Sequence, residues 1–269
     1  QPGASPNTNA LNAGINAVVL IELSGANGDG VGGLSVNAAG TVIRGLNIHG
    51  AGDEISVNAS NVTIAGNFIG TNPAGTTEGC SNCGGFGIRL ETGDNNVFGG
   101  GAAADRNLIS GDQQGAIALN SGNGTLIQGN YIGTDITGTL AINGIGGREG
   151  IRGCPDSNTI ILGNLISSNS SGGVHLFQCS VDQVGGGRIQ GNFIGTQRDG
   201  VSALGNNFGL QLGSGWLVGG TVPGQGNTIA FNLFGITVYN NASGSSILGN
   251  SFLSNNEGLG IFLSGGFIN

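Results

Sequence analysis

Short runs of alternating apolar and variable residues recur along the whole chain. A typical run starts with glycine, continues with an apolar and a variable residue, and ends on a second apolar residue. Counting one shifted copy, the runs begin at Gly33, Glu54, Gly87, Gly115, Gly150, Gly173, Gly209, Gly235 and Gly260. A period of two is typical of β-strands, and no window of comparable length has a helical period. The pattern therefore predicts an all-β chain without a helical domain.

Two further short apolar runs follow each copy. After the Gly87 copy, for example, Asn96-Val-Phe and then Asn107-Leu-Ile follow. Three strands per turn, repeated about nine times, describe a three-sided coil in which each strand pairs with its equivalent one turn later. We therefore expect one parallel β-helix domain over residues 1–269, with an extended N-terminal segment over residues 1–18.

A column of asparagines fits this register. The bend between the second and third strands of successive turns carries Asn67, Asn107, Asn130, Asn164, Asn192, Asn227 and Asn250. Asparagine tolerates the left-handed backbone that a sharp bend requires. Stacked asparagine amides also bond to one another along the axis of a stack of strands. The sequence therefore predicts a structural asparagine ladder.

A longer repeat is superimposed on the short one. GNFIGTNPAG, GNYIGTDITG and GNFIGTQRDG begin at Gly66, Gly129 and Gly191, at intervals of 63 and 62 residues. In the inferred register this phrase marks the bend and third strand of every second turn. The residues that follow it, 71–86, 134–149 and 197–208, are expected to form loops that project from one corner.

Composition limits the classes of partner. Gly accounts for 58 of the 269 residues, charged residues are 8%, and the formal net charge is −8 with no lysine in the chain. Nucleic-acid affinity comes largely from neutralising phosphates, so nucleic acid is not an expected partner. The longest purely apolar run, 17–21, is too short to span a bilayer, so no membrane insertion is expected.

The runs GNFIGTNPAG, GNYIGTDITG, NLISG and NNVFGG resemble the parallel β-helix repeats of large secreted or surface bacterial proteins. Those proteins share the right-handed fold of pectate lyases, and the resemblance covers nearly the whole chain. It implies a right-handed, single-stranded parallel β-helix and an extracellular or cell-surface location. The fold hosts many functions, so the activity has to be argued from the site residues.

Four cysteines, Cys80, Cys83, Cys154 and Cys179, allow two interpretations. Cys154 and Cys179 each follow the first strand of consecutive turns, which brings them near the separation that a disulfide needs. Cys80 and Cys83 lie at another corner and reach only each other. We predict the disulfides Cys80–Cys83 and Cys154–Cys179. The alternative, a zinc site, needs four converging ligands, and Cys154 is expected too far away.

Candidate chemistry lies on the outer face of the first strands. The variable positions there are Ser35, Ser56, Arg89, Ala118, Arg152, His175, Gln211, Thr237 and Phe262. Arg89, Arg152 and His175 form a small basic island, which indicates a strip that binds acidic polysaccharide. The alternative is three solvated side chains on an exposed sheet. No Asp or Glu occupies the column, so we assign no catalytic residue, metal or cofactor.

These observations favour a non-catalytic, extracellular structural or adhesive solenoid. Unpaired strand edges at the two ends favour either end-to-end stacking into filaments of the same chain or a segment of a longer surface repeat protein. The N-terminal stretch is expected to fold across one end or to reach a neighbour. The alternative is a polysaccharide-binding or polysaccharide-cleaving, lyase-like protein that uses Arg89, Arg152 and His175.

Overall fold

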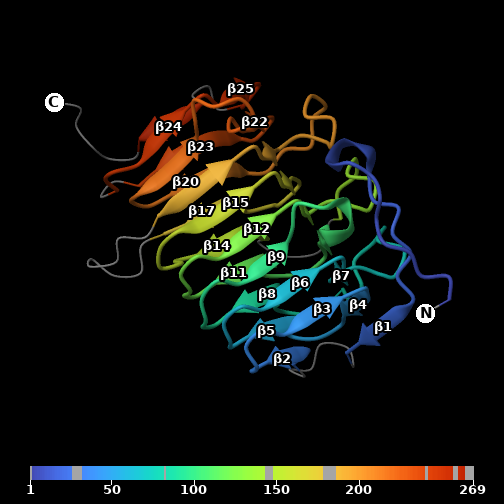
Figure 1. Cartoon of the computed structure of the whole chain (residues 1–269). Helices are drawn as coiled ribbons and strands as arrows, with labels where there is room; N and C mark the ends of the chain where they lie inside the picture. The colour runs from blue at the N-terminus through green and yellow to red at the C-terminus, as the bar shows by residue number, and fades with distance from the viewer. Residues whose placement is uncertain are drawn as a thin grey trace.

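The computed structural model is a stack of short strands wound into a three-sided coil (Figure 1). The structure describes residues 2–25, 32–81, 83–142, 148–177, 186–239, 242–256 and 260–263. Within them, the strands form parallel sheets of nine, nine and eight strands, and neighbouring strands in each sheet are equivalent strands of successive turns. The chain is therefore the parallel β-helix that the repeats predict.

Each turn contributes one strand to each of three sheets, named here by their order within the turn. The first-strand sheet consists of β2 (Leu34–Val36), β5 (Ile55–Val57), β8 (Phe86–Leu90), β11 (Gly115–Leu119), β14 (Glu149–Gly153), β17 (Gly172–Leu176), β20 (Phe208–Leu212), β23 (Phe234–Val238) and β26 (Ile261–Leu263). The second-strand sheet consists of β3 (Val42–Arg44), β6 (Thr63–Ala65), β9 (Val97–Gly99), β12 (Leu126–Gln128), β15 (Thr159–Leu162), β18 (Gly187–Gln190), β21 (Trp216–Gly219) and β24 (Ser246–Leu248). The third-strand sheet consists of β1 (Ile21–Ser24), β4 (Leu46–His49), β7 (Phe68–Ile69), β10 (Leu108–Ile109), β13 (Tyr131–Ile132), β16 (Leu165–Ile166), β19 (Phe193–Ile194), β22 (Thr228–Ala230) and β25 (Ser251–Leu253). Two 3-10 turns, η1 (Leu11–Ala13) and η2 (Ala103–Asp105), are the helical elements of the described chain.

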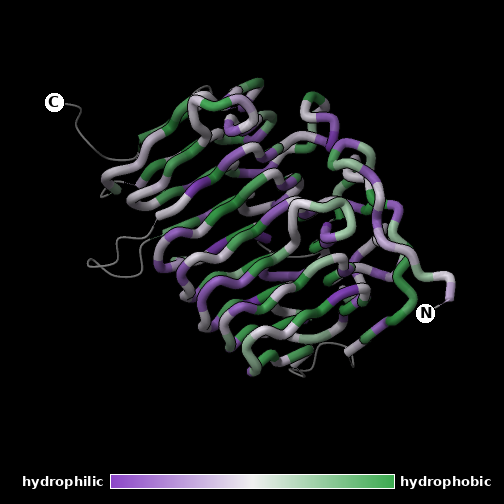
Figure 2. Tube along the Cα trace, in the orientation of Figure 1, coloured by the Kyte–Doolittle hydropathy of each residue, from purple (hydrophilic) through white to green (hydrophobic). Residues whose placement is uncertain are grey.

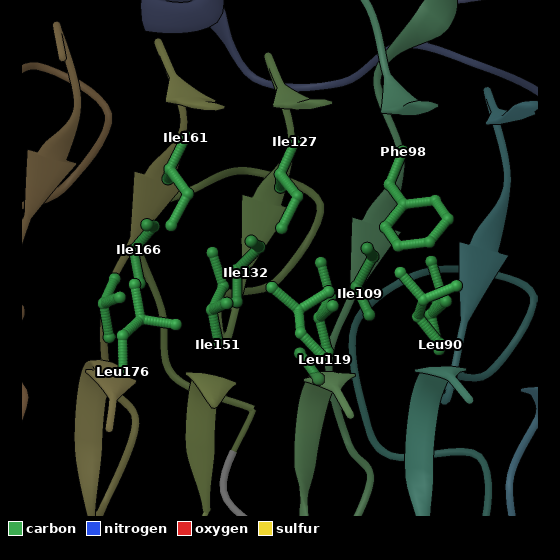
Figure 3. Packing of buried hydrophobic residues seen from close by; sticks show 14 of the residues in the cluster. Leu90, Phe98, Ile109, Leu119, Ile127, Ile132, Ile151, Ile161, Ile166 and Leu176 are labelled. Atoms are coloured by element: carbon green, nitrogen blue, oxygen red, sulfur yellow. The ribbon is translucent and has the colours of Figure 1, made fainter. Parts of the chain in front are cut away.

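The interior of the coil is filled by aliphatic side chains from all three sheets (Figure 3). Like residues stack in register: Ile109 pairs with Ile69 on one side and with Ile132 on the other, and all three are fully buried. Figure 2 shows hydrophobic and hydrophilic positions interleaved along each turn, as the period of two requires. Each buried aliphatic side chain stabilises the fold by about 1.5–3 kcal/mol, so repetition of a small unit holds the coil together.

Asparagines line the bend between the second and third strands. Asn130 donates from Nδ2 to Oδ1 of Asn164 at 3.1 Å, and its own Oδ1 accepts from Nδ2 of Asn107 at 3.0 Å. The same contact links every neighbouring pair from Asn67 to Asn250. These amides satisfy each other and the bend carbonyls, so their hydrogen bonds offset the cost of removing them from water.

A second asparagine column lies at the bend that follows the third strand. Asn169, Asn206, Asn232 and Asn255 are joined in the same way, with Nδ2 to Oδ1 distances between 2.9 and 3.2 Å. It occupies the upper turns, whereas Asp112 lies at this corner lower in the coil. This second column was not predicted from the sequence.

The three corner loops lie back on the outer face of the third-strand sheet. Each is closed by an antiparallel bridge: Thr71 with Glu78, Thr134 with Ala141, and Thr196 with Ala203. Gly75 has a φ of +64°, and a Cβ there would lie 2.7 Å from Cδ2 of Leu108, so only glycine lets the loop approach so closely. The loops also bond to one another, because Ile136 N–H donates to the Gly75 carbonyl at 2.7 Å. The repeated phrase thus encodes a stack of mutually supporting loops.

The N-terminal segment runs along the same outer face rather than across one end of the coil (Figure 1). Ile15 is buried there against an apolar cluster of Phe68, Leu108, Tyr131 and Leu165. Ile15 N–H donates to the Ile136 carbonyl at 2.9 Å, and Arg106 Nη1 donates to the Asn9 carbonyl at 2.9 Å. The segment is therefore a strap that covers the apolar outer side of the third-strand sheet.

Candidate functional site

The outer face of the first-strand sheet carries the predicted column of variable residues. Arg89 pairs with Ala118, Ala118 with Arg152, and Arg152 with His175. The column continues in register to Ser35 and Ser56 below, and to Gln211, Thr237 and Phe262 above. The structure thus brings the three candidate ligand residues into one line, with a single small side chain between the two arginines.

That small side chain lies at the base of a shallow groove of about 370 Å³. The groove is lined by Phe86, Arg89, Gln114, Ala118, Asn120, Arg152, Gly153, Cys154 and Phe177. Its floor follows β11, where Gly115 and Ala118 replace the larger outward side chains of the turns on either side. The groove therefore arises because the β11 turn carries small outward residues where the turns on either side carry larger ones.

Arg89 forms the lower side of the groove and is held on three sides. Its Nε and Nη2 donate to the two carboxylate oxygens of Asp53 at 2.7 and 3.1 Å. Glu91 lies 3.6 Å away, and the guanidinium lies 4.8 Å from the ring centroid of Phe86. Asp53 also accepts a hydrogen bond from Phe86 N–H at 2.9 Å, so one carboxylate fixes both the cation and the aromatic residue.

Arg152 forms the upper side in a similar way. Its Nε lies 3.1 Å from Oε2 of Glu149, which is three residues earlier in the same strand. Its guanidinium lies 5.8 Å from the ring centroid of Phe86 and 5.9 Å from that of Phe177. Each groove arginine therefore has both a carboxylate and an aromatic face as partners.

His175 connects the groove to the turns above it. Its Nδ1 lies 2.5 Å from Oε1 of Glu149, and its Nε2 lies 2.5 Å from the hydroxyl of Tyr239. Burial, followed by the field of Glu149, raises the pKa of Tyr239, so the phenol keeps its proton. Glu149 and Tyr239 therefore engage the two ring nitrogens of His175, Nδ1 and Nε2 respectively.

The predicted basic island is therefore a set of ion pairs. Arg89, Arg152 and His175 lie in one column, as predicted from the sequence, whereas their partners Asp53, Glu149 and Tyr239 were not predicted. Glu149 and Arg152 share a face although they are three residues apart, because the sheet register skips Gly150 between the paired positions. A strict period of two places such a pair on opposite faces. The only sign in the sequence that Glu149 and Arg152 share a face is the break in the alternation of apolar and variable residues at the glycine-rich start of each copy.

One of the two predicted disulfides, Cys80–Cys83, is present in the structure. Cys80 and Cys83 form a disulfide with a Cα–Cα distance of 5.7 Å, which confirms that prediction and removes both thiolates from any zinc site. The second predicted pair, Cys154–Cys179, includes Cys179, which lies outside the described residues.

Two buried carboxyl groups lie away from the groove. Both carboxylate oxygens of Glu54 are 3.2 Å from Ala51 N, and burial raises the pKa of Glu54 to about 7. Asp112 is also buried, and burial followed by the nearby Glu54 raises its pKa well above the usual value. These groups hold protons at pH values where exposed carboxyl groups are ionised.

Neither a clustered metal-ligand set nor a membrane-spanning helix is found in the part of the chain that is described. Across its residues, no group of three or more His, Cys, Asp or Glu side chains is arranged to hold a metal ion. The same residues contain no helix that is both long and apolar enough to cross a membrane.

Comparison with known proteins gives one informative likeness. No family model matches the sequence, and no curated protein matches it. Among solved structures, the chain is similar to the crystal structure of pectate lyase Pel9A, with a TM-score of 0.52 and 14% sequence identity. The match covers 90% of this chain and 66% of that chain, so the chain spans just under two thirds of its length. At this identity the likeness shows the fold, a right-handed parallel β-helix.

Proposed function

We propose that this chain is an extracellular polysaccharide-binding β-solenoid whose ligand lies in the groove over Ala118. The observation that carries the proposal is the groove itself, in which Arg89 and Arg152 face each other across a floor of small residues. Its position on an outer sheet face suits an extended ligand. The fold likeness to a protein named as a pectate lyase supports a polysaccharide-related role.

The groove is organised before a ligand arrives. Arg89 is held by two hydrogen bonds to Asp53 and by the Phe86 ring, so it has little side-chain entropy left to lose on binding. Arg152 is more exposed and is oriented by its ion pair with Glu149 and by the Phe177 ring. The exposed amides of Gln114 and Asn120 add donors and acceptors at the rim, one at each end of β11. Planar polar groups beside aromatic rings match the alternating hydroxyl edges and apolar faces of sugar rings.

Binding without hydrolysis fits the state of the carboxylates. Glycoside hydrolysis usually uses two carboxyl groups that flank the scissile bond. Asp53, Glu91 and Glu149 are instead engaged with the groove cations. The Cys80–Cys83 disulfide favours an oxidising compartment, which supports a location outside the cell or on its surface. The proposed role is therefore adhesive.

Affinity electrophoresis in gels that contain single soluble polysaccharides tests this proposal. We expect at least one glycan to retard the chain, and Ala118→Trp, which fills the groove, to abolish the retardation. Ser35→Trp adds the same side chain to the same outward column outside the groove and should leave the retardation unchanged. Circular dichroism checks that both variants fold. Failure of every glycan to retard the wild-type chain, or equal retardation of Ala118→Trp, would contradict the proposal.

A second candidate function, end-to-end assembly, is favoured by the exposed apolar side chains of the outermost strands. Phe262 and Leu263 in β26 are 47% and 58% exposed, and Ile21 and Leu23 in β1 are 41% and 38% exposed. A second copy stacked on either end would cover them and pair the edge strands. Electron microscopy with sedimentation tests this: fibres would support stacking, and a uniform monomer at all concentrations would rule it out.

A further inference from the structure

We infer that the groove takes a neutral, hydroxyl-rich glycan and rejects polyuronates. This inference rests on the proposed function and names the ligand class of the same site. It differs from what the column of Arg89, Arg152 and His175 indicates in the sequence alone, where those residues suggest an acidic ligand. The difference comes from the carboxylates that the fold brings to the groove.

Charge at the groove is the first argument. Two guanidinium groups, those of Arg89 and Arg152, face three carboxylates, those of Asp53, Glu91 and Glu149, so the formal charge of this set is −1. The whole chain carries −8 and has no lysine. A polyuronate brings one negative charge per sugar and would meet net repulsion both at long range and in the groove.

The carboxylates that pair with the cations are themselves anchored. Asp53 accepts from Arg89 through both oxygens and also from the Phe86 N–H, so turning it away would break three hydrogen bonds. Glu149 is bound by Nδ1 of His175, and His175 is bound in turn by Tyr239. A uronate carboxylate would have to displace one of these anchored carboxylates to reach a guanidinium, and the displaced group would remain beside it.

A neutral sugar meets a better match. A hydroxyl donates and accepts, so it can bind an ion-paired guanidinium and its carboxylate at the same time, whereas a carboxylate only accepts. At the rim, Glu91 Oε2 accepts from Nδ2 of Asn120 at 2.7 Å, which sets an acceptor beside an amide. The groove therefore presents donors and acceptors side by side, and this pattern selects vicinal hydroxyls over anionic groups.

The test compares ligands that differ only in charge. A panel of neutral glycans (galactan, mannan, β-glucan) and polyuronates (polygalacturonate, alginate) is screened by affinity electrophoresis. The best neutral glycan is then compared, by calorimetry, with the same glycan after oxidation of its primary hydroxyls to carboxylates. If a polyuronate binds instead, its carboxyl-reduced form is the matched ligand. We expect the neutral form to bind at least tenfold more tightly.

A charge variant sharpens the result. Glu91→Gln brings the formal charge of the set to zero while keeping an acceptor for Asn120. We expect this variant to reduce the ratio of affinities, neutral over charged ligand, by about threefold, because one weakly screened charge contact contributes a free energy of that order. Asp199→Asn removes the same charge from a corner loop and should leave the preference for the neutral ligand unchanged.

The possible failures are distinct. Equal or tighter binding of the charged form overturns the neutral-ligand inference and leaves polysaccharide binding in place. The absence of binding to every glycan in the panel overturns the proposed function, and the inference falls with it. A preference unchanged in Glu91→Gln shows that charge at the groove does not select the ligand, which also overturns the inference.

Discussion

The hydroxyl of Tyr239 lies 2.5 Å from Nε2 of His175, although 64 residues separate them in the sequence. Tyr239 follows β23 and His175 belongs to β17, so the contact passes over the intervening strand β20 on the outside of the sheet. Through Glu149 the chain of contacts continues to Arg152 at the groove. One side of the groove is therefore fixed by residues from turns well above it.

Removing this tyrosine hydroxyl should weaken ligand binding more than its distance from the groove suggests. In Tyr239→Phe, His175 loses its Nε2 partner and Glu149 loses a fixed orientation, so we expect about a threefold loss of glycan affinity and about 1 kcal/mol of stability. Calorimetry and thermal unfolding measure the two effects. Tyr131→Phe is the matched control, because its hydroxyl bonds the N-terminal strap and its loss should lower stability alone. Unchanged affinity in Tyr239→Phe would show that the contact does not position Arg152.

A central asparagine of the bend column should be far more important for stability than a terminal one. Asn130 is fully buried, donates to the Phe98 carbonyl and to Asn164, and accepts from Asn107. Asn130→Ala leaves several of these groups buried without partners, so we expect a loss of about 2–4 kcal/mol in the free energy of unfolding. In Asn250→Ala, at the partly exposed end of the column, water replaces the lost partners and the loss should be below about 1.5 kcal/mol. Chemical denaturation of both variants gives the comparison, and equal losses would mean that the column is not cooperative.

The strand positions were predictable from the sequence because every turn packs the same kinds of side chain at the same positions. The motif that begins at Gly87 places Ile88 and Leu90 inward and Arg89 outward, and the following copies keep the same register one turn on. The last described copy keeps the register too, although Ile261 and Leu263 are exposed. The asparagine bend was predictable for the same reason, because Asn107 and Asn130 each occupy the same step of their turns. Regular features with a fixed period can be read from one chain.

The candidate site was less predictable because its partners obey no period. Asp53 comes from the corner before β5, and Glu149 shares a face with Arg152 only where the alternation breaks at Gly150. Tyr239 reaches His175 through side-chain length rather than strand pairing. The sequence revealed two arginines and a histidine in a column, but only the fold reveals that carboxylates already pair with them.

The N-terminal strap should contribute measurable stability through one side chain. Ile15 is buried against Phe68, Leu108 and Tyr131 on the outer side of the third-strand sheet. Ile15→Ala should therefore cost about 2–3 kcal/mol, the lower part of the range for large-to-small changes, because the strap can partly collapse into the cavity. Val18→Ala shortens an exposed side chain of the same segment, which is 45% exposed, and should cost less than about 0.5 kcal/mol. Thermal unfolding compares the two, and a similar small effect in both would mean that the strap is only loosely attached.

Buried Glu54 should make the fold less stable as the pH rises through neutrality. Burial raises its pKa from 4.5 to about 7, so the folded chain holds a proton that the unfolded chain releases. A carboxyl group with a raised folded pKa contributes stability that is fully present below the unfolded pKa and is lost as pH rises through the folded pKa. The free energy of unfolding should therefore decrease by an amount on the order of 3 kcal/mol as the pH rises from about 5 to about 8. The midpoint temperature of thermal unfolding should decrease over the same pH range.

Glu54→Gln isolates this effect from the other acidic residues. Glutamine keeps an acceptor for Ala51 N–H but does not titrate, so the variant should lose the part of the decline in stability that comes from Glu54 and should equal or exceed the wild type at pH 8. Asp112, whose pKa burial raises well above its usual value, should retain a dependence of the same sign in the variant. Glu91→Gln, which changes an exposed carboxylate, is the control and should keep the wild-type profile. Parallel stability profiles for Glu54→Gln and the wild type would show that Glu54 is ionised in the fold, with its carboxylate stabilised by the backbone N–H of Ala51 rather than by protonation.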